Sequence, residues 1–394
     1  MRSITTTRSR FIQLIALVLA LGLVVFVAVR EPDFARIQVS SLSDLERELE
    51  GLRRRLRIPG MSAAIAEGDH VVWTRGFGMA NLERGVIAGP NTIYHLASVT
   101  KPFASTVLLQ LVDEGRLDLN APISDFGLPM ARSTPVRVWH LLSHTSGEKP
   151  GTTYRYDGNV FGNLTEVIER ATGRAFAREL TDRIIRPLGL THTAPNPGDP
   201  HGVSSFVVSL SVSPEDVERA RAIFGLSGLE RGPIEAGLAM GYARRWGRSI
   251  WPTGLFGAMR PMSHGFTLST TSGLVASAPD VARFSIALDQ GRLLKASTRQ
   301  RAWTPVTTPE GKTLPYGLGW FVQQSQQISL VWHYGHGFEA SSLLVKLPDH
   351  RVTFVILANS DGLSRWRRLG DDANLLASPA AVLFLNWYSG RQRQ

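Results

Sequence analysis

Ser98-Val99-Thr100-Lys101 places a serine and a lysine three residues apart, and this stretch decides how the rest of the chain is interpreted. Pro102 suits a first helical turn, and apolar residues then recur at helical spacing until Gly115. The pattern predicts an amphipathic helix that begins near Ser98, with Lys101 on the same face. A serine hydroxyl needs a neighbouring base to act as a nucleophile, and a desolvated lysine can be that base. Taken alone, the spacing also fits a helix cap followed by a solvated lysine.

The N-terminal region joins a basic start to an apolar run. Residues 1–10 contain three arginines and predict a short cytoplasmic tail, and residues 11–29 are apolar and long enough to cross a bilayer. We interpret residues 11–29 as an uncleaved transmembrane helix, with a cleaved signal segment and secretion as the alternative. A juxtamembrane linker over residues 30–42 then leads to a domain over residues 43–390. This domain is expected on the extracytoplasmic side of the cell membrane.

Composition excludes several kinds of site. The chain has 394 residues and 43% hydrophobic content, enough for a large globular domain. It contains no cysteine, which rules out disulfides, thiolate metal sites and a cysteine nucleophile. The ten histidines show no H-E-x-x-H spacing, so we expect no metal and no cofactor. A net charge of +10 raises nucleic-acid binding as a hypothesis, but the arginines are mostly scattered and export argues against it.

Hydrophobic patterning places strands near both ends of the domain. The middle, from about residue 110 to 260, has helical periodicity broken by glycine and proline. We expect an α/β (α+β) fold in which an antiparallel sheet, flanked by helices, is built from both ends of the chain around an inserted, mainly helical subdomain. The expected strands are 61–66, 70–75, 318–322, 328–333, 341–347 and 352–359, and a last helix is expected over 379–387.

Several motifs follow Ser98 in a fixed order. Together they cover roughly residues 58 to 361 and resemble the serine beta-lactamases and penicillin-binding-protein-like serine hydrolases, nearest to the class C and esterase-like branch. The resemblance implies a beta-lactamase/transpeptidase-like fold and acyl transfer through a serine. The motifs are LLSHTSG (141–147), PGTTYRYDGN (150–159), VIERATGRAF (167–176), SGLVASAPDVARF (272–284), LPYGLGW (314–320) and WHYGHGFEASSLLVKLPDHRVTFVILANSDG (332–362).

The resemblance also implies roles for individual residues. Ser98 matches the acylated nucleophile, and Lys101 matches the lysine that activates it. Tyr156 matches the tyrosine of the family's Tyr-x-Asn element; a nearby lysine would lower its pKa and let it relay a proton to the leaving group. His144 and Ser146, in contrast, are expected to form a structural turn rather than a catalytic pair.

The family's Lys-Thr-Gly element matches His333-Tyr334-Gly335, and the resemblance thereby places His333 among the catalytic residues. Gly335 would let the strand approach the substrate closely, and the backbone N–H groups of Ser98 and His336 would form the oxyanion hole. His333 is mostly neutral at pH 7, so it does not supply the fixed positive charge that the usual lysine offers to a substrate carboxylate.

A second departure concerns the Tyr-x-Asn element. Gly158 stands where the family usually has asparagine, and Asn159 is the alternative residue for holding an acyl amide. Both departures favour ester or amide substrates over efficient beta-lactam hydrolysis. We therefore expect an exported, membrane-anchored serine hydrolase that is esterase-like or D,D-peptidase-like, acting on small esters or amides or on cell-wall peptides. The alternative is a non-catalytic cell-envelope binding protein on the same fold.

Overall fold

The computed structural model describes residues 33–198, 214–245, 258–262, 267–325, 327–364 and 369–392. The predicted transmembrane helix over residues 11–29 lies outside these ranges. Within them, no helix is both long and apolar enough to cross a membrane.

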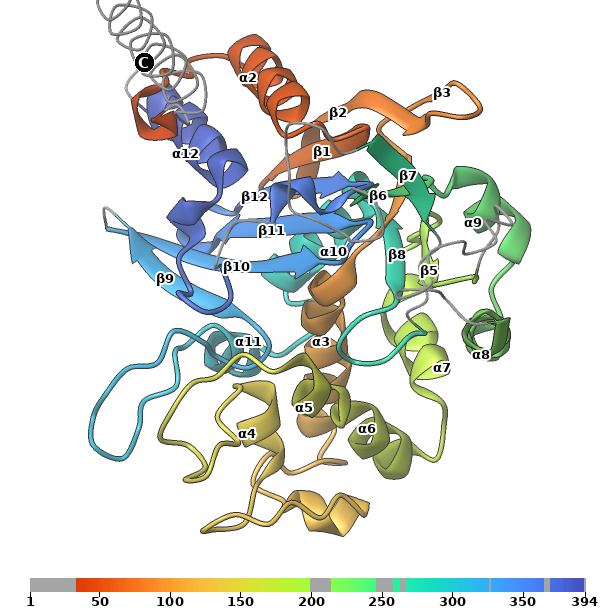
Figure 1. The fold of residues 1–394 in the computed structure, drawn as a ribbon. Coiled ribbons are helices and arrows are strands. Elements are labelled where there is room, and N and C mark those ends of the chain that lie inside the picture. Colours follow the sequence, from red (N-terminus) through yellow and green to blue (C-terminus); the bar gives the residue numbers. More distant parts are fainter. Residues whose placement is uncertain are drawn as a thin grey trace, which may run out of the picture.

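A seven-stranded antiparallel sheet is the central element, in the order β3-β2-β1-β12-β11-β10-β9 (Figure 1). Strands from the N-terminal and C-terminal parts of the chain meet in the middle of this sheet, where Met61 in β1 pairs with Ala358 in β12. The prediction that one sheet is built from both ends of the chain is confirmed. The strands are β1 (Gly60–Glu67), β2 (His70–Asn81), β3 (Val86–Ile87), β9 (Phe321–Ser325), β10 (Ile328–His336), β11 (Ser341–Leu347) and β12 (Val352–Ala358).

Both faces of the central strands are buried, and side chains alternate between two hydrophobic cores. In β12, Phe354 and Ile356 join one core, whereas Val355 and Leu357 join the other. This is the period-2 pattern of a strand covered on both sides.

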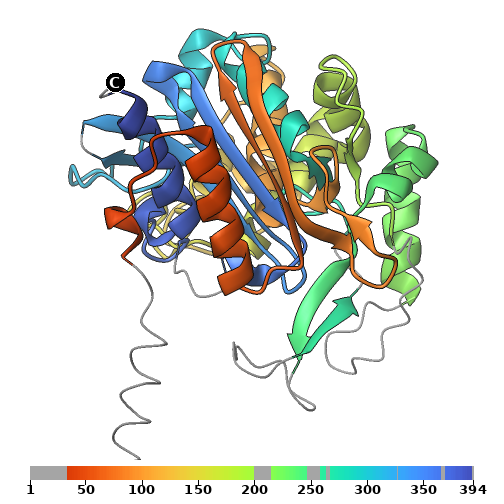
Figure 2. The ribbon, with the colours of Figure 1, turned by 90° about the horizontal axis from the view of Figure 1, so that it is seen from above.

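One face of the sheet is covered by helices from the two ends of the described chain, α2 (Leu42–Arg55) and α12 (Pro379–Arg391), which lie side by side (Figure 2). The Ser41 hydroxyl caps α2 by accepting a hydrogen bond from the Asp44 N–H, while Asp44 bonds back to the Ser41 backbone. Asn386 in α12 donates hydrogen bonds to the carbonyl groups of Phe34 and Ile37. Part of the stretch predicted as a linker thus packs on the domain.

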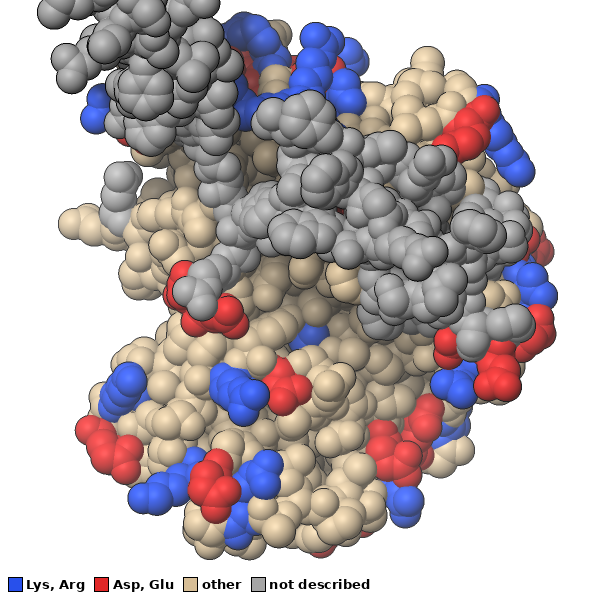
Figure 3. Space-filling model, viewed as in Figure 1, with Lys and Arg blue, Asp and Glu red and all other residues tan. Residues whose placement is uncertain are grey.

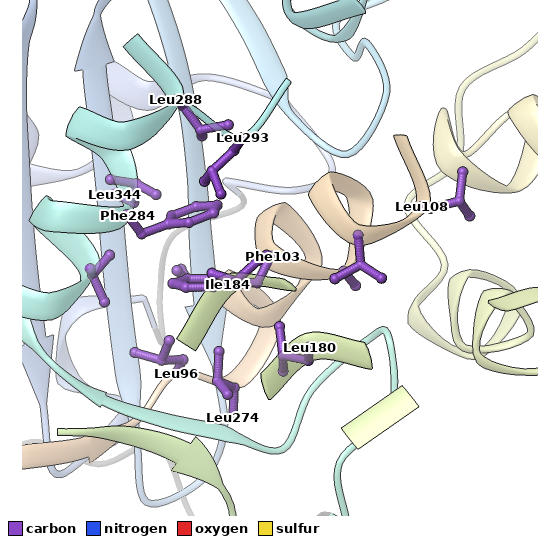
Figure 4. Packing of buried hydrophobic residues seen from close by; sticks show 14 of the residues in the cluster. Leu96, Phe103, Leu108, Leu180, Ile184, Leu274, Phe284, Leu288, Leu293 and Leu344 are labelled. Atoms are coloured by element: carbon purple, nitrogen blue, oxygen red, sulfur yellow. The ribbon is translucent and has the colours of Figure 1, made fainter. Parts of the chain in front are cut away.

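The other face packs against α10 (Ala278–Asp289) and against the helix that carries Lys101, α3 (Thr100–Asp113). Phe103 of α3 and Phe284 of α10 stack with ring centroids 3.8 Å apart (Figure 4). Almost every residue of α3 is buried, which differs from the expected amphipathic helix. The reason is its position: α3 runs between the sheet and the helical subdomain, so most of its surface is covered on every side (Figure 1).

The remaining elements form the predicted helical subdomain and two small sheets. The order of the three-stranded sheet is β4-β8-β5, and β6 pairs with β7. The helices are α4 (Val138–Leu142), α5 (Gly158–Gly162), α6 (Leu164–Thr172), α7 (Phe176–Leu180), α8 (Pro214–Ser227), α9 (Arg231–Gly237) and α11 (Ala296–Ala302); the strands are β4 (Ile93–His95), β5 (Thr193–Pro195), β6 (Gly241–Arg245), β7 (Ala258–Met262) and β8 (Leu274–Ser277).

Candidate active site

Ser98 lies in a 3₁₀ turn, η2 (Ala97–Val99), that joins β4 to α3. The Ser98 side chain is partly exposed, whereas Lys101, one turn later, is fully buried. A hydrogen bond of 2.8 Å joins Lys101 Nζ to Ser98 Oγ. The structure therefore brings together the two residues whose spacing first suggested a nucleophile and its base.

Burial sets the charge of Lys101. Loss of water around the amine lowers its pKa from 10.5 to about 7, while the nearby Asp157 carboxylate acts in the opposite direction. Lys101 Nζ also donates to the Thr271 carbonyl oxygen over 3.2 Å and lies 5.0 Å from the centre of the Tyr156 ring. A substantial fraction of Lys101 is therefore neutral near pH 7 and able to accept the Ser98 proton.

Tyr156 stands on the other side of the lysine. Its hydroxyl is buried and forms no hydrogen bond with the described residues, although the nearby Ser98 hydroxyl favours the ionised phenol. Burial raises the pKa of Tyr156 well above its ordinary value of 10. The expectation that Lys101 lowers this pKa is wrong, because desolvation of the buried phenol is the largest influence on it and raises it. Tyr156 is a neutral phenol and thus a proton donor.

His144 fixes the segment that carries Tyr156. Its carbonyl oxygen accepts from the Arg155 N–H over 2.9 Å, and its Nδ1 accepts from the Asp157 N–H over 3.1 Å. The His144 ring also packs on the Tyr156 ring. The motif LLSHTSG contains His144, but its spacing gives no sign that the imidazole reaches a backbone group 13 residues later. His144 is therefore more than part of a turn: it holds the backbone on both sides of Tyr156.

Gly158 begins α5 beside the lysine. A Cβ at this position would lie 3.2 Å from Thr271 Oγ1 and 3.9 Å from Lys101 Nζ. Asn159, the alternative holder of an acyl amide, is exposed on α5. The space next to Lys101 is thus bordered by Thr271, a residue that no motif in the sequence singled out.

His333 is fully buried in β10. Its Nδ1 lies 2.7 Å from the Tyr334 carbonyl oxygen and therefore carries the hydrogen, while its Nε2, at 2.9 Å, accepts from the Tyr316 hydroxyl. Burial and the neighbouring Lys101 hold the pKa of His333 well below 6.5. Both ring nitrogens are engaged within the protein, so His333 is a neutral group that orients Tyr316 and does not offer a charge to a substrate.

Gly335 brings β10 against η2, the turn that carries Ser98. A Cβ at Gly335 would lie 2.2 Å from both the Leu96 carbonyl oxygen and Ser342 Oγ, and the Ser342 hydroxyl donates to that same carbonyl over 2.6 Å. Ala97 adopts a positive φ of 46°, which places a non-glycine residue in the left-handed region directly before Ser98. His336 follows Gly335 at the end of β10, so its backbone belongs to the strand that touches this turn.

The surface is hollowed on the side that Figure 1 presents, between the sheet and the helices below it (Figure 3). Among the described residues, no cluster of His, Asp and Glu has the arrangement of a metal site. The groups that meet at Lys101 are a hydroxyl, from Ser98, and a phenol ring, from Tyr156.

Comparison with known sequences identifies relatives of the chain. The family model described as Beta-lactamase matches residues 45–378. A penicillin-binding protein of Bacillus subtilis is 22% identical over 75% of this chain and 67% of its own length. A D-aminopeptidase of Gluconobacter oxydans is 24% identical over 70% of this chain, which spans about half (51%) of that protein.

Solved structures agree on the fold. An octameric penicillin-binding protein homologue from Pyrococcus abyssi superposes with a TM-score of 0.68 at 21% identity, over 89% of this chain and 78% of the other. A D-amino acid amidase from Ochrobactrum anthropi gives a TM-score of 0.62 at 20% identity, over 88% and 99%. At these identities the likeness concerns the fold.

Proposed function

The chain belongs to the beta-lactamase family of serine hydrolases, and on this premise we propose that Ser98 is its nucleophile. The observation that carries the proposal is the 2.8 Å contact between Ser98 Oγ and the amine of Lys101, whose pKa lies at about 7. An exposed lysine would remain protonated at that pH and could not accept a proton. The buried amine supplies the base that a serine nucleophile requires.

The acylation step follows from these groups. Ser98 Oγ attacks the carbonyl carbon of an ester or amide, and neutral Lys101 takes the hydroxyl proton. The backbone N–H groups of Ser98 and His336 donate to the oxyanion. The bond between the carbonyl carbon and the leaving oxygen or nitrogen then breaks. Tyr156 gives its phenolic proton to the leaving atom and regains a proton from the Lys101 ammonium.

Hydrolysis of the acyl-serine restores the enzyme. Water attacks the acyl carbon while Lys101, neutral again, takes one proton from the water. The bond to Ser98 Oγ breaks, and this proton passes to the departing serine oxygen. One water is consumed, and the acid product and a neutral Lys101 remain.

The substrate we propose is an ester or an amide, including peptides of D-amino acids, rather than a beta-lactam. The feature that supports this choice is His333, which is buried and neutral and so offers no charge to the carboxylate of a lactam. The name of the D-aminopeptidase relative points the same way. We further propose that residues 11–29 anchor the enzyme with its domain outside the cytoplasmic membrane, supported by their apolar composition and the preceding arginines.

A serine-directed fluorophosphonate tests the nucleophile. The full-length wild-type protein should take up one label, the Ser98→Ala variant should take up none, and Ser146→Ala should label like wild type. Labelling that persists in Ser98→Ala would show that another serine reacts. Turnover of a para-nitrophenyl ester that is lost in Lys101→Ala would exclude the alternative of a non-catalytic binding protein.

The location is tested separately. In one experiment, intact cells that produce the 394-residue chain are treated with a protease that cannot cross the membrane. In a separate experiment, membranes from untreated cells are washed with alkaline carbonate. An anchored, exported enzyme is degraded in intact cells and stays with the washed membranes. Protection from the protease, or release by the carbonate wash, would contradict the anchor.

A further inference from the structure

The loop before β8 runs directly beside the catalytic lysine. Its Thr271 carbonyl oxygen is the second hydrogen-bond partner of Lys101 Nζ, at 3.2 Å. The neighbouring Thr270 ties the loop to α5, because its hydroxyl donates to the Phe161 carbonyl oxygen over 2.9 Å. Its N–H also donates to Thr165 Oγ1 over 2.9 Å. The position of Thr271 is therefore set by the same helix that begins at Gly158.

The two glycines of α5 show how the Thr271 side chain is oriented. A Cβ at Gly162 would lie 4.0 Å from Thr271 Cγ2, whereas a Cβ at Gly158 would lie 3.2 Å from Thr271 Oγ1. Since positions 158 and 162 lie on one face of the helix, the methyl group faces one glycine and the hydroxyl faces the other. The hydroxyl thus borders the space left open by Gly158, close to Lys101. Within the described part of the chain, this hydroxyl makes no hydrogen bond.

We infer that Thr271 is a specificity-determining residue, whose hydroxyl hydrogen-bonds a nitrogen-bearing substituent on the carbon next to the scissile carbonyl. The inference rests on the proposed function. Lys101 Nζ lies 2.8 Å from Ser98 Oγ and 3.2 Å from the Thr271 carbonyl oxygen, so Ser98 and Thr271 flank the same amine. Because Gly158 has no Cβ, no side chain from this position of α5 stands against the Thr271 hydroxyl; a Cβ there would lie only 3.2 Å from the hydroxyl oxygen. A hydroxyl both donates and accepts, so it can serve an α-amido carbonyl or an α-ammonium group.

The test compares para-nitrophenyl esters that share a leaving group: propionate, which has no α-nitrogen, N-acetylalanine and free alanine. Thr271→Val keeps the shape of the side chain and the backbone carbonyl that holds Lys101, but removes the hydroxyl. We expect its kcat/KM to fall about tenfold more on an α-nitrogen ester than on the propionate ester. Thr271→Ser should restore the wild-type ratio, and Thr267→Val, in the same loop, should leave the ratio unchanged. The N-acetyl and free-amine esters distinguish an amide partner from an ammonium partner.

A second variant changes the residue of α5 that lies next to the Thr271 hydroxyl. Gly158→Ala places a methyl group 3.2 Å from Thr271 Oγ1 and fills the proposed space, so it should reduce the same ratio. Equal losses on all esters in Thr271→Val, or no loss on any, would overturn the inference while Ser98 labelling and propionate turnover still support the proposed function. Absence of ester turnover by the wild-type enzyme would overturn both.

Discussion

The imidazole of His144 packs on the phenol ring of Tyr156, with ring centroids 4.5 Å apart and planes inclined by 38°. The backbone bonds of His144 to Arg155 and Asp157 bracket the tyrosine in sequence. Through these contacts, a residue from another loop determines where the phenol stands relative to Ser98 and Lys101. His144 acts through Tyr156 and is a positioning residue.

Replacement of His144 by phenylalanine should therefore lower kcat more than it raises KM. The ring contact is kept, but the Asp157 N–H loses its acceptor, which costs about 1–3 kcal/mol of stability when the group stays buried. We expect kcat for a para-nitrophenyl ester to fall about tenfold if the phenol is displaced, the equivalent of about 1.4 kcal/mol in the barrier. Steady-state kinetics and urea unfolding measure the two effects.

His140 offers a matched control for this prediction. Its Nδ1 accepts from the Arg137 N–H over 2.9 Å, the same kind of bond at a site away from Tyr156. His140→Phe should lose comparable stability while kcat is retained. A similar loss of kcat in both variants would mean that His144 has only a structural role.

Most of the fold can be predicted from local patterns in the sequence. The strands near both ends follow from alternating apolar residues, and the spacing of Ser98 and Lys101 is fixed as soon as a helix begins there. The positive φ of Ala97 is different, because it depends on contacts with β10, more than 230 residues away. The pKa of Lys101 depends likewise on burial by segments that are remote in sequence. The pKa of Tyr156 is raised for the same reason, which a prediction from the neighbouring Lys101 alone misses.

The pKa of Lys101 predicts the pH dependence of activity. Only the neutral amine accepts a proton from Ser98, so kcat/KM should fall tenfold per pH unit below about pH 7 and level off above it. The acidic limb should be measured with a neutral ester, whose own charge does not change with pH. A limb centred near pH 10 would indicate that the lysine is solvated in the free enzyme.

The same burial predicts that Lys101 destabilises the fold. The unfolded chain keeps the Lys101 proton up to about pH 10.5, but the folded protein releases it near pH 7. Between these values the unfolded state binds more protons, so this group makes stability rise with pH. Lys101→Met should raise the free energy of unfolding by about 2–4 kcal/mol at pH 7 while abolishing turnover. A loss of stability in this variant, in urea unfolding at pH 7, would contradict the buried, desolvated amine.

The burial of His333 predicts part of the loss of folding stability in acid. It stays neutral in the folded protein because its pKa lies well below 6.5, whereas the unfolded chain takes up a proton near that pH. The unfolded state therefore binds more protons below pH 6.5, and this residue lowers stability by about 1.4 kcal/mol per pH unit as the pH falls. His333→Gln can keep both hydrogen bonds without titrating. The variant should unfold with a shallower pH dependence than wild type between pH 6 and 5, and equal slopes would contradict the assignment.

The close approach of β10 to η2, the turn that carries Ser98, predicts a large loss of activity on substitution of Gly335. An alanine there would place its Cβ 2.2 Å from the Leu96 carbonyl oxygen, a backbone atom that cannot rotate away. The strand must move from the turn, at a cost of about 1–3 kcal/mol in stability. Because the displacement separates the backbone of His336 from Ser98, kcat/KM for an ester should fall on the order of 100-fold.

Gly51→Ala is the control, since a Cβ at this exposed position of α2 meets no atom within 4 Å. That variant should gain about 0.5–1 kcal/mol and keep full activity, as measured by urea unfolding and ester hydrolysis. Full activity in Gly335→Ala would show that the proposed oxyanion hole does not depend on this contact.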